Sequence, residues 1–277
     1  MKKIWNMCVN IYNFFCDMSD DHVGIYAAQA SFFIFLSAFP FFLLLLNALA
    51  HTALDESYVI YLINTYIPHS LNPILIQLVN ELYTHASGAL LSITAILAVW
   101  SASKGFLAVM FGLYEIFNIH QKRNYIILRL TSMIYTIFFI FLIVLSMTFI
   151  VFGNKLLKLA FSYIPGLQDI HFALDLIRYG FFFLIMVLFF ALLFRIINFK
   201  LTTFHIVLPG AVVCALGWSI FSYAFSVYID NFFNMSYMYG SFTGVVLLMM
   251  WFYFCIYILF IGAEIIRHAY PGSRKDS

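Results

Sequence analysis

Residues 100–115 read Trp100-Ser-Ala-Ser-Lys104-Gly-Phe-Leu-Ala-Val-Met-Phe-Gly112-Leu-Tyr-Glu115. This stretch is largely apolar and contains two ionisable residues. When it is wound as an α-helix, its small residues fall on one face at spacings of four, three and four. They are Ser101, Gly105, Ala108 and Gly112. A stripe of small residues allows a second helix to approach closely, so the stretch is predicted to be a tightly packed membrane helix.

The composition of the whole chain places it in a membrane. Of its 277 residues, 64% are hydrophobic and only 9% are charged. A soluble domain has about a quarter of its residues charged. The lipid bilayer is therefore the expected partner for most of the surface. The net charge of +2 is too small to indicate nucleic-acid binding, which needs clustered basic residues.

Six segments are long and apolar enough to cross a bilayer, which takes about 20 residues. The predicted spans are 30–50, 88–113, 126–152, 177–197, 206–228 and 242–263. Pro40 lies inside the first span and favours a kink there. The predicted fold is an all-α membrane protein with a segment 1–22, a six-helix transmembrane domain 23–264 and a tail 265–277.

Short amphipathic helices are expected outside the spans. Residues 4–18 place their apolar side chains on one face, which suits a helix in the membrane interface or one packed on the cytosolic face of the bundle. In the first outside loop, residues 58–66 and 74–83 also have helical spacing, with a proline-bounded turn between them. Residues 153–175 are predicted to form a further loop.

The distribution of Lys and Arg predicts that both termini are cytosolic, because these residues concentrate on the cytosolic side of membrane proteins. The chain has 14 Lys and Arg residues, and with this orientation three of them lie outside, namely Lys155, Lys158 and Arg178. The other eleven fall in or beside cytosolic segments: Lys2, Lys3, Lys104, Lys122, Arg123, Arg129, Arg195, Lys200, Arg267, Arg274 and Lys275.

Lys104 is the first candidate site residue, because a cation within a span is costly. The orientation brings it and Glu264 toward the same side of the membrane. Two hypotheses stay open: a structural ion pair between Lys104 and Glu264, or a polar cavity that Lys104 lines. Ser101, Ser103 and Gln29 are the other polar residues expected to converge there.

The expected helix-packing positions share a small side chain. They are Gly105, Ala108 and Gly112 in the second span and Gly210 and Gly217 in the fifth.

The sequence contains no motif of a common catalytic or metal site. None of its eight histidines forms an HExxH or another metal-binding spacing. A phosphate-binding P-loop, a dinucleotide fingerprint and a GxSxG nucleophile motif are also missing from the sequence. We therefore expect no metal, no cofactor and no enzymatic activity.

Three blocks of sequence resemble the YihY/BrkB family of bacterial inner-membrane proteins, once labelled ribonuclease BN. The first is Ala27-Ala-Gln-Ala-Ser31 with Leu36-Ser-Ala-Phe-Pro40, and the second is Trp100-Ser-Ala-Ser-Lys104-Gly-Phe106 with Leu113-Tyr-Glu-Ile-Phe-Asn118. The third comprises Leu208-Pro-Gly-Ala211, Trp218, Tyr239-Gly-Ser241, Trp251-Phe-Tyr253 and Gly262-Ala-Glu264. The resemblance implies a multi-pass, six-helix protein of the bacterial inner membrane, and it implies no established activity.

Three functions are compatible with these features. The first is transport or handling of a lipid-like, amphipathic solute, which needs a groove or cavity. The second is a non-transporting scaffold or assembly partner, which needs none. The third, a ribonuclease as the old label suggests, ranks last, because the carboxylates are scattered over both sides of the predicted membrane domain.

Overall fold

The structure is a computed structural model that describes residues 2–50, 56–66, 72–84, 87–119, 124–142, 171–197, 204–232 and 242–269. Every regular element within these ranges is an α-helix. In chain order the helices are α1 (Lys2–Asp20), α2 (Val23–Ala50), α3 (Glu56–Tyr66), α4 (Asn72–Thr84), α5 (Gly88–Ile116), the third-span helix (Tyr125–Leu142), α7 (His171–Ile197), α8 (Phe204–Phe232) and α10 (Phe242–Ala269).

Six of the described helices are long and apolar enough to cross a membrane, which confirms the predicted fold class. The candidate spans are Val23–Phe41, Gly88–Ile116, Tyr125–Leu142, Gly180–Ile197, Phe204–Ile229 and Thr243–Ala269. The predicted end of the third span, 143–152, and most of the predicted loop, 153–170, lie outside the described residues. Residues 171–175 of that loop are helical, in α7.

Two helices extend beyond the predicted spans, because the predicted bounds cover only the roughly 20 residues that cross a bilayer core, whereas a helix can continue beyond it. The first helix starts at Val23 rather than near residue 30. Its hydroxyls bond to carbonyls of their own helix, Ser31 to Ala28 at 2.8 Å and Ser37 to Ile34 at 2.6 Å. The last helix continues past the predicted end at 263 to Ala269.

The ends of α5 are set by local chemistry. Ser87 has an extended backbone and its hydroxyl accepts a hydrogen bond from the Leu90 N–H at 3.2 Å, so it caps the start of the helix. After Ile116 the chain turns at Asn118, whose φ of 50° is in the left-handed region that Asn tolerates. These signals fix the 29-residue helix that contains the stretch 100–115.

The six candidate spans contact one another in a closed circuit. The largest helix–helix contact joins α2 to α5, and α2 also packs on α10, α10 on α8 and α8 on α7. The third-span helix completes the circuit through two ring contacts. Its Tyr135 lies 5.3 Å from Phe106 of α5, and its Phe139 lies 4.9 Å from Phe189 of α7, both between ring centroids.

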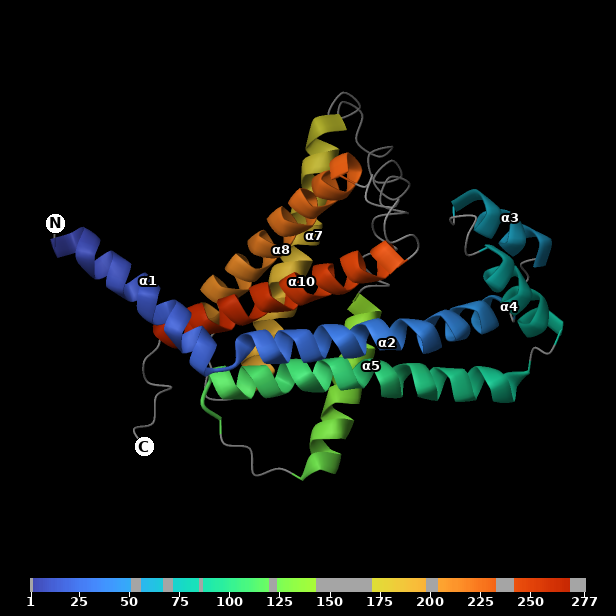
Figure 1. Cartoon of the computed structure of the whole chain (residues 1–277), viewed down its shortest axis with the longest axis horizontal. Helices are drawn as coiled ribbons and strands as arrows, with labels where there is room; N and C mark the ends of the chain where they lie inside the picture. Colours follow the sequence, from blue (N-terminus) through green and yellow to red (C-terminus); the bar gives the residue numbers. More distant parts are fainter. Residues whose placement is uncertain are drawn as a thin grey trace, which may run out of the picture.

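Figure 1 shows that α1 and the end of α10 lie at one end of the bundle, whereas α3 and α4 lie at the opposite end, beyond α2 and α5. The helices α3 and α4 pack on each other through the buried Val59 and Val79. The predicted amphipathic helices in 4–18, 58–66 and 74–83 thus fall within α1, α3 and α4.

Candidate functional site

Arg267 binds three carboxylates where α1 meets the end of α10. Its Nη1 donates to Asp21 Oδ2 at 2.5 Å, and its Nη2 lies 3.4 Å from Asp17 Oδ2. Its Nη2 also donates to Glu264 Oε1. With His268, these residues are called the end cluster: Asp17, Asp21, Glu264, Arg267 and His268. The cluster connects three parts of the chain: α1, the turn between α1 and α2, and the end of α10.

The same guanidinium also reaches α5, since its Nη1 donates to the Ile116 carbonyl at 3.2 Å. The last carbonyls of a helix have no partner within that helix, so this bond satisfies one of them. Arg267 is therefore a four-way connection between α1, the α1–α2 turn, α5 and α10.

Burial sets the electrostatics of the end cluster. Glu264 is fully buried, whereas the side chain of Arg267 is 19% exposed. Burial raises the pKa of the Asp21 carboxyl above its ordinary value of 3.8, and the adjacent Arg267 offsets part of that rise. A buried carboxylate needs a charged partner, so Glu264 depends on Arg267.

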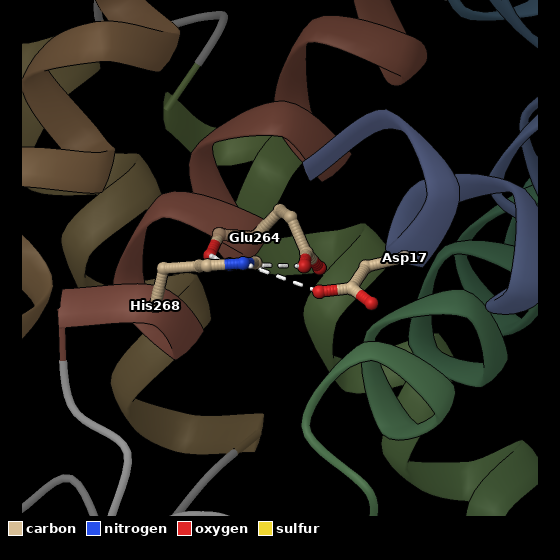
Figure 2. Close-up of side chains that lie close together, drawn as sticks. All are labelled: Asp17, Glu264 and His268. Carbon is tan, nitrogen blue, oxygen red and sulfur yellow. Dashed lines mark hydrogen bonds and ion pairs between the residues drawn. The ribbon is translucent and has the colours of Figure 1, made fainter. Parts of the chain in front are cut away.

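Three members of the end cluster form a constellation that could hold a metal ion. The ligand atoms of Asp17, Glu264 and His268 lie within 4.8 Å of one another. Figure 2 shows the imidazole of His268 facing both carboxylates, with Nε2 3.2 Å from Asp17 Oδ2 and Nδ1 3.1 Å from Glu264 Oε1. Both of these oxygens are also paired with Arg267, so a metal ion would compete with a guanidinium that is already in place.

The Lys104–Glu264 ion pair, one of the two hypotheses, is not formed, because the two residues lie at different heights in the bundle. Glu264 binds Arg267, which reaches the carbonyl of Ile116. Ile116 is separated from Lys104 by about 18 Å of helix. The Lys104 side chain is instead exposed, and its Nζ lies 5.7 Å from the ring centroid of Phe33.

The other expected polar residues do not converge on a cavity with Lys104 and Glu264 in the described structure. Ser103 is buried and donates to the Trp100 carbonyl at 2.8 Å, within its own helix. Ser101 is half-buried and Gln29 is exposed on α2.

The small residues of the predicted stripe lie at helix contacts. A Cβ added at Gly105 would be 2.5 Å from the Ile34 side chain of α2. One added at Gly112 would be 2.5 Å from the Phe260 ring of α10, and Ala108 between them is buried. On α8, Gly217 packs against Ile258, and Gly210 packs against the backbone of Gly262.

A buried arginine in the third-span helix was not anticipated as a site residue. Arg129 is 4% exposed. Its Nη2 donates to the Trp100 carbonyl at 2.6 Å, and its guanidinium lies 4.6 Å from the centroid of the Trp100 ring. Its Nε and Nη1 are buried and have no hydrogen-bond partner among the described residues. The sequence signal was available, since Arg129 is the one charged residue in the span Tyr125–Leu142.

A partly open pocket lies between α5, the third-span helix and α7. We call it the aromatic groove. Its lining side chains are apolar apart from the Tyr135 hydroxyl: Phe106, Tyr135, Phe138, Phe189, Leu192, Leu193, Ile196 and Ile197. The groove is shallow, with a cavity volume of about 10 Å³, which is room for about one water molecule, so a ligand would lie along it rather than inside it.

Comparison with known proteins gives a consistent family assignment. The family described as "Virulence factor BrkB" matches residues 14–275. The "Putative ribonuclease-like protein YfkH" of Bacillus subtilis (strain 168) is 34% identical over 240 residues, which cover 86% of this chain and 87% of that protein.

A second relative is the "UPF0761 membrane protein PSHAa0171" of Pseudoalteromonas translucida (strain TAC 125). It is 26% identical over 123 residues, which cover 44% of this chain and 39% of that protein. No solved structure matches. The match to the family along nearly the whole chain, together with the six candidate spans, shows that this chain is a multi-pass membrane protein that belongs to the BrkB family.

Proposed function

We propose that this protein binds and transports a lipid-like, amphipathic solute in the bacterial inner membrane, using the aromatic groove. The groove carries this proposal, because it offers an apolar, partly open lining formed by three membrane helices. The outer face of the third-span helix is also apolar and exposed, at Leu130, Ile134 and Ile137, as expected for contact with lipid tails.

The orientation that goes with this proposal has both termini in the cytosol. The excess of Lys and Arg in the predicted cytosolic segments supports it. The position of α1 and the end of α10 at one end of the bundle is compatible with an even number of crossings. In this orientation the end cluster lies on the cytosolic side.

A scaffold without transport is the competing proposal, and the end cluster favours it. Its carboxylates are paired with Arg267, as expected for groups that hold helices together. We do not propose a nuclease activity, although one relative has "ribonuclease-like" in its name. The carboxylates of the end cluster that could bind a catalytic metal are already bound to a guanidinium.

A reconstituted lipid-translocation assay tests the transport proposal. The full-length protein is placed in vesicles with a trace of fluorescent lipid, and dithionite reports the rate at which that lipid changes leaflet. The assay is repeated with a range of headgroups. Wild-type vesicles are expected to exchange lipid faster than vesicles without protein. If vesicles with and without protein exchange lipid at the same rate for every headgroup tested, the transport proposal is contradicted.

Two matched tryptophan variants of α7 show whether the groove is responsible. Leu192 lines the aromatic groove, and Leu188, one turn earlier, is 49% exposed on the outside. Leu192→Trp should fill the groove and slow exchange, whereas Leu188→Trp should exchange at the wild-type rate. If both variants behave alike, transport does not use this groove.

A further inference from the structure

Arg129 is a buried cation without an anion. Its side chain is almost fully buried, and no Asp or Glu lies within ion-pair distance of it among the described residues. The stacking on Trp100 stabilises the positive charge, and the Trp100 carbonyl uses one nitrogen, Nη2. Nε and Nη1 remain without an acceptor in the described chain.

The neighbouring hydroxyls of the same helix do not supply that acceptor. Ser132 donates to the Arg129 carbonyl at 2.8 Å, and Thr136 donates to the Ser132 carbonyl at 2.8 Å. Both hydroxyls therefore satisfy backbone groups. A buried guanidinium with unmade hydrogen bonds is costly in a membrane, and an anion with two or more acceptor oxygens removes that cost.

Arg267 provides the contrast within the same molecule. It lies against three carboxylates and a helix-terminal carbonyl, as expected for a structural arginine. Arg129 is also a buried cation that requires hydrogen-bond acceptors, but it contacts only the ring and the carbonyl of Trp100. The difference indicates that the partner of Arg129 comes from outside the described chain.

A second cation lies nearby on α5. Lys104 follows Trp100 by one helical turn, so the two share a face of the helix. Its side chain is exposed and has no ion pair among the described residues. An anion beside Trp100 would thus be bound by the guanidinium of Arg129 and attracted by the positive charge of Lys104.

The same two helices also contribute to the lining of the aromatic groove. Tyr135 and Phe106, which line the groove, are each six residues beyond Arg129 and Trp100 respectively. Six residues correspond to about 9 Å of helix. The spacing fits an amphipathic molecule that has an anionic head beside Arg129 and an apolar part in the groove.

We propose that Arg129, supported by Lys104, binds a phosphate-type anion whose natural source is the headgroup of an anionic lipid. The inference rests on the proposed function, because it names the chemical class of the solute that the aromatic groove takes. Guanidinium binds phosphate oxygens in a bidentate manner, which an ammonium group cannot reproduce.

The test measures the thermal unfolding of the purified full-length protein in detergent with one of three additions: phosphatidylglycerol, phosphatidylcholine with the same acyl chains, or inorganic phosphate. A ligand that binds the folded state raises the unfolding temperature. Phosphatidylglycerol is expected to raise it more than phosphatidylcholine does. A rise with inorganic phosphate that also depends on Arg129 would identify a free phosphate, rather than a lipid, as the source of the bound anion.

Three variants assign the effect to the guanidinium. Arg129→Met removes a buried unpaired charge, so the variant should fold and lose the preference for phosphatidylglycerol. Arg129→Lys keeps the charge and should bind about tenfold more weakly than wild type. Arg195→Gln is the control, because Arg195 is a half-buried arginine stacked on an aromatic ring, Phe204, at the same 4.6 Å. This control should keep the preference.

Equal stabilisation of wild type by the two lipids would overturn the inference, as would equal losses in Arg129→Met and Arg195→Gln. Either result leaves the proposed function standing if lipid exchange in vesicles is still accelerated. If no lipid is exchanged but phosphatidylglycerol still binds through Arg129, the transport proposal fails and the anion site remains.

Discussion

The Nη1 atom of Arg267 lies 2.5 Å from the Oδ2 atom of Asp21, although 246 residues separate the two in the chain. This pair fastens the end of the last membrane helix to the turn between α1 and α2. The same guanidinium neutralises Glu264, which is fully buried. The end cluster should therefore be a major source of stability, and a change at Arg267 should reveal it.

Replacing Arg267 by Gln should lower the free energy of unfolding by about 3–5 kcal/mol, because it leaves a buried carboxylate uncompensated. Thermal unfolding in detergent measures the effect. The double change Arg267→Gln with Glu264→Gln should regain part of the loss. Arg195→Gln, at an arginine stacked on Phe204, should cost about 1 kcal/mol or less. If Arg267→Gln alone unfolds at the same temperature as wild type, the end cluster does not contribute to stability.

Asp21 should give the end cluster a distinct pH dependence. Burial raises its pKa above 3.8, so the folded state holds this proton more tightly than the unfolded chain does. The stability it contributes is then fully present below the unfolded pKa and is lost as the pH rises through the folded pKa. The stability of wild type minus that of Asp21→Asn should therefore fall as the pH rises above 3.8. A difference that grows over this range would mean that Arg267 outweighs burial.

Gly262 offers a test of close helix packing. A Cβ there would overlap the Cys214 Sγ and the Gly210 carbonyl of α8. Gly262→Ala should thus destabilise the protein by about 1–3 kcal/mol. Gly244, on the same helix, has nothing within 4 Å of an added Cβ. Gly244→Ala should be neutral or stabilising by up to about 1 kcal/mol, because alanine favours the helix. If Gly262→Ala and Gly244→Ala have the same thermal unfolding temperature, this packing is contradicted.

The proposed orientation predicts opposite accessibilities for two exposed serines, Ser19 of α1 and Ser57 of α3. Each is changed to Cys in a background whose four native cysteines are replaced. In intact bacterial cells, a membrane-impermeant maleimide should label Ser57→Cys and should label Ser19→Cys only after the cells are permeabilised. The reverse pattern would place both termini outside.

The sequence predicted most of the fold, because hydropathy alone defines helices that must cross a bilayer. Six spans and the helices at 4–18, 58–66 and 74–83 were all identifiable. Boundaries were less predictable, because hydropathy defines the part of a helix that crosses the bilayer core but not how far the helix continues beyond it, as α2 and α10 do. The small residues Gly105 and Gly112 could be assigned to a packing face from their spacing, but not to their partners.

The candidate sites were harder to predict, because they depend on which helices meet and at what height. Lys104 and Glu264 have opposite charges and are predicted on the same side of the membrane. These two properties do not show whether the residues lie at the same height in neighbouring helices. The i, i+3 spacing of Glu264 and Arg267 did contain the correct pairing. Arg129 was counted as one more cytosolic charge, and its burial against Trp100 follows only from the crossing of two helices.

Photo-crosslinking tests the central claim, lipid binding in the aromatic groove, most directly. The wild-type protein and the Leu192→Trp and Leu188→Trp variants are reconstituted with a lipid that has a photoactivatable acyl chain, and the modified residues are mapped by mass spectrometry. We predict adducts concentrated at groove residues such as Phe106, Tyr135 and Phe189, reduced in Leu192→Trp and unchanged in Leu188→Trp. Adducts spread evenly over the exposed helix faces, with the same pattern in both variants, would contradict the account.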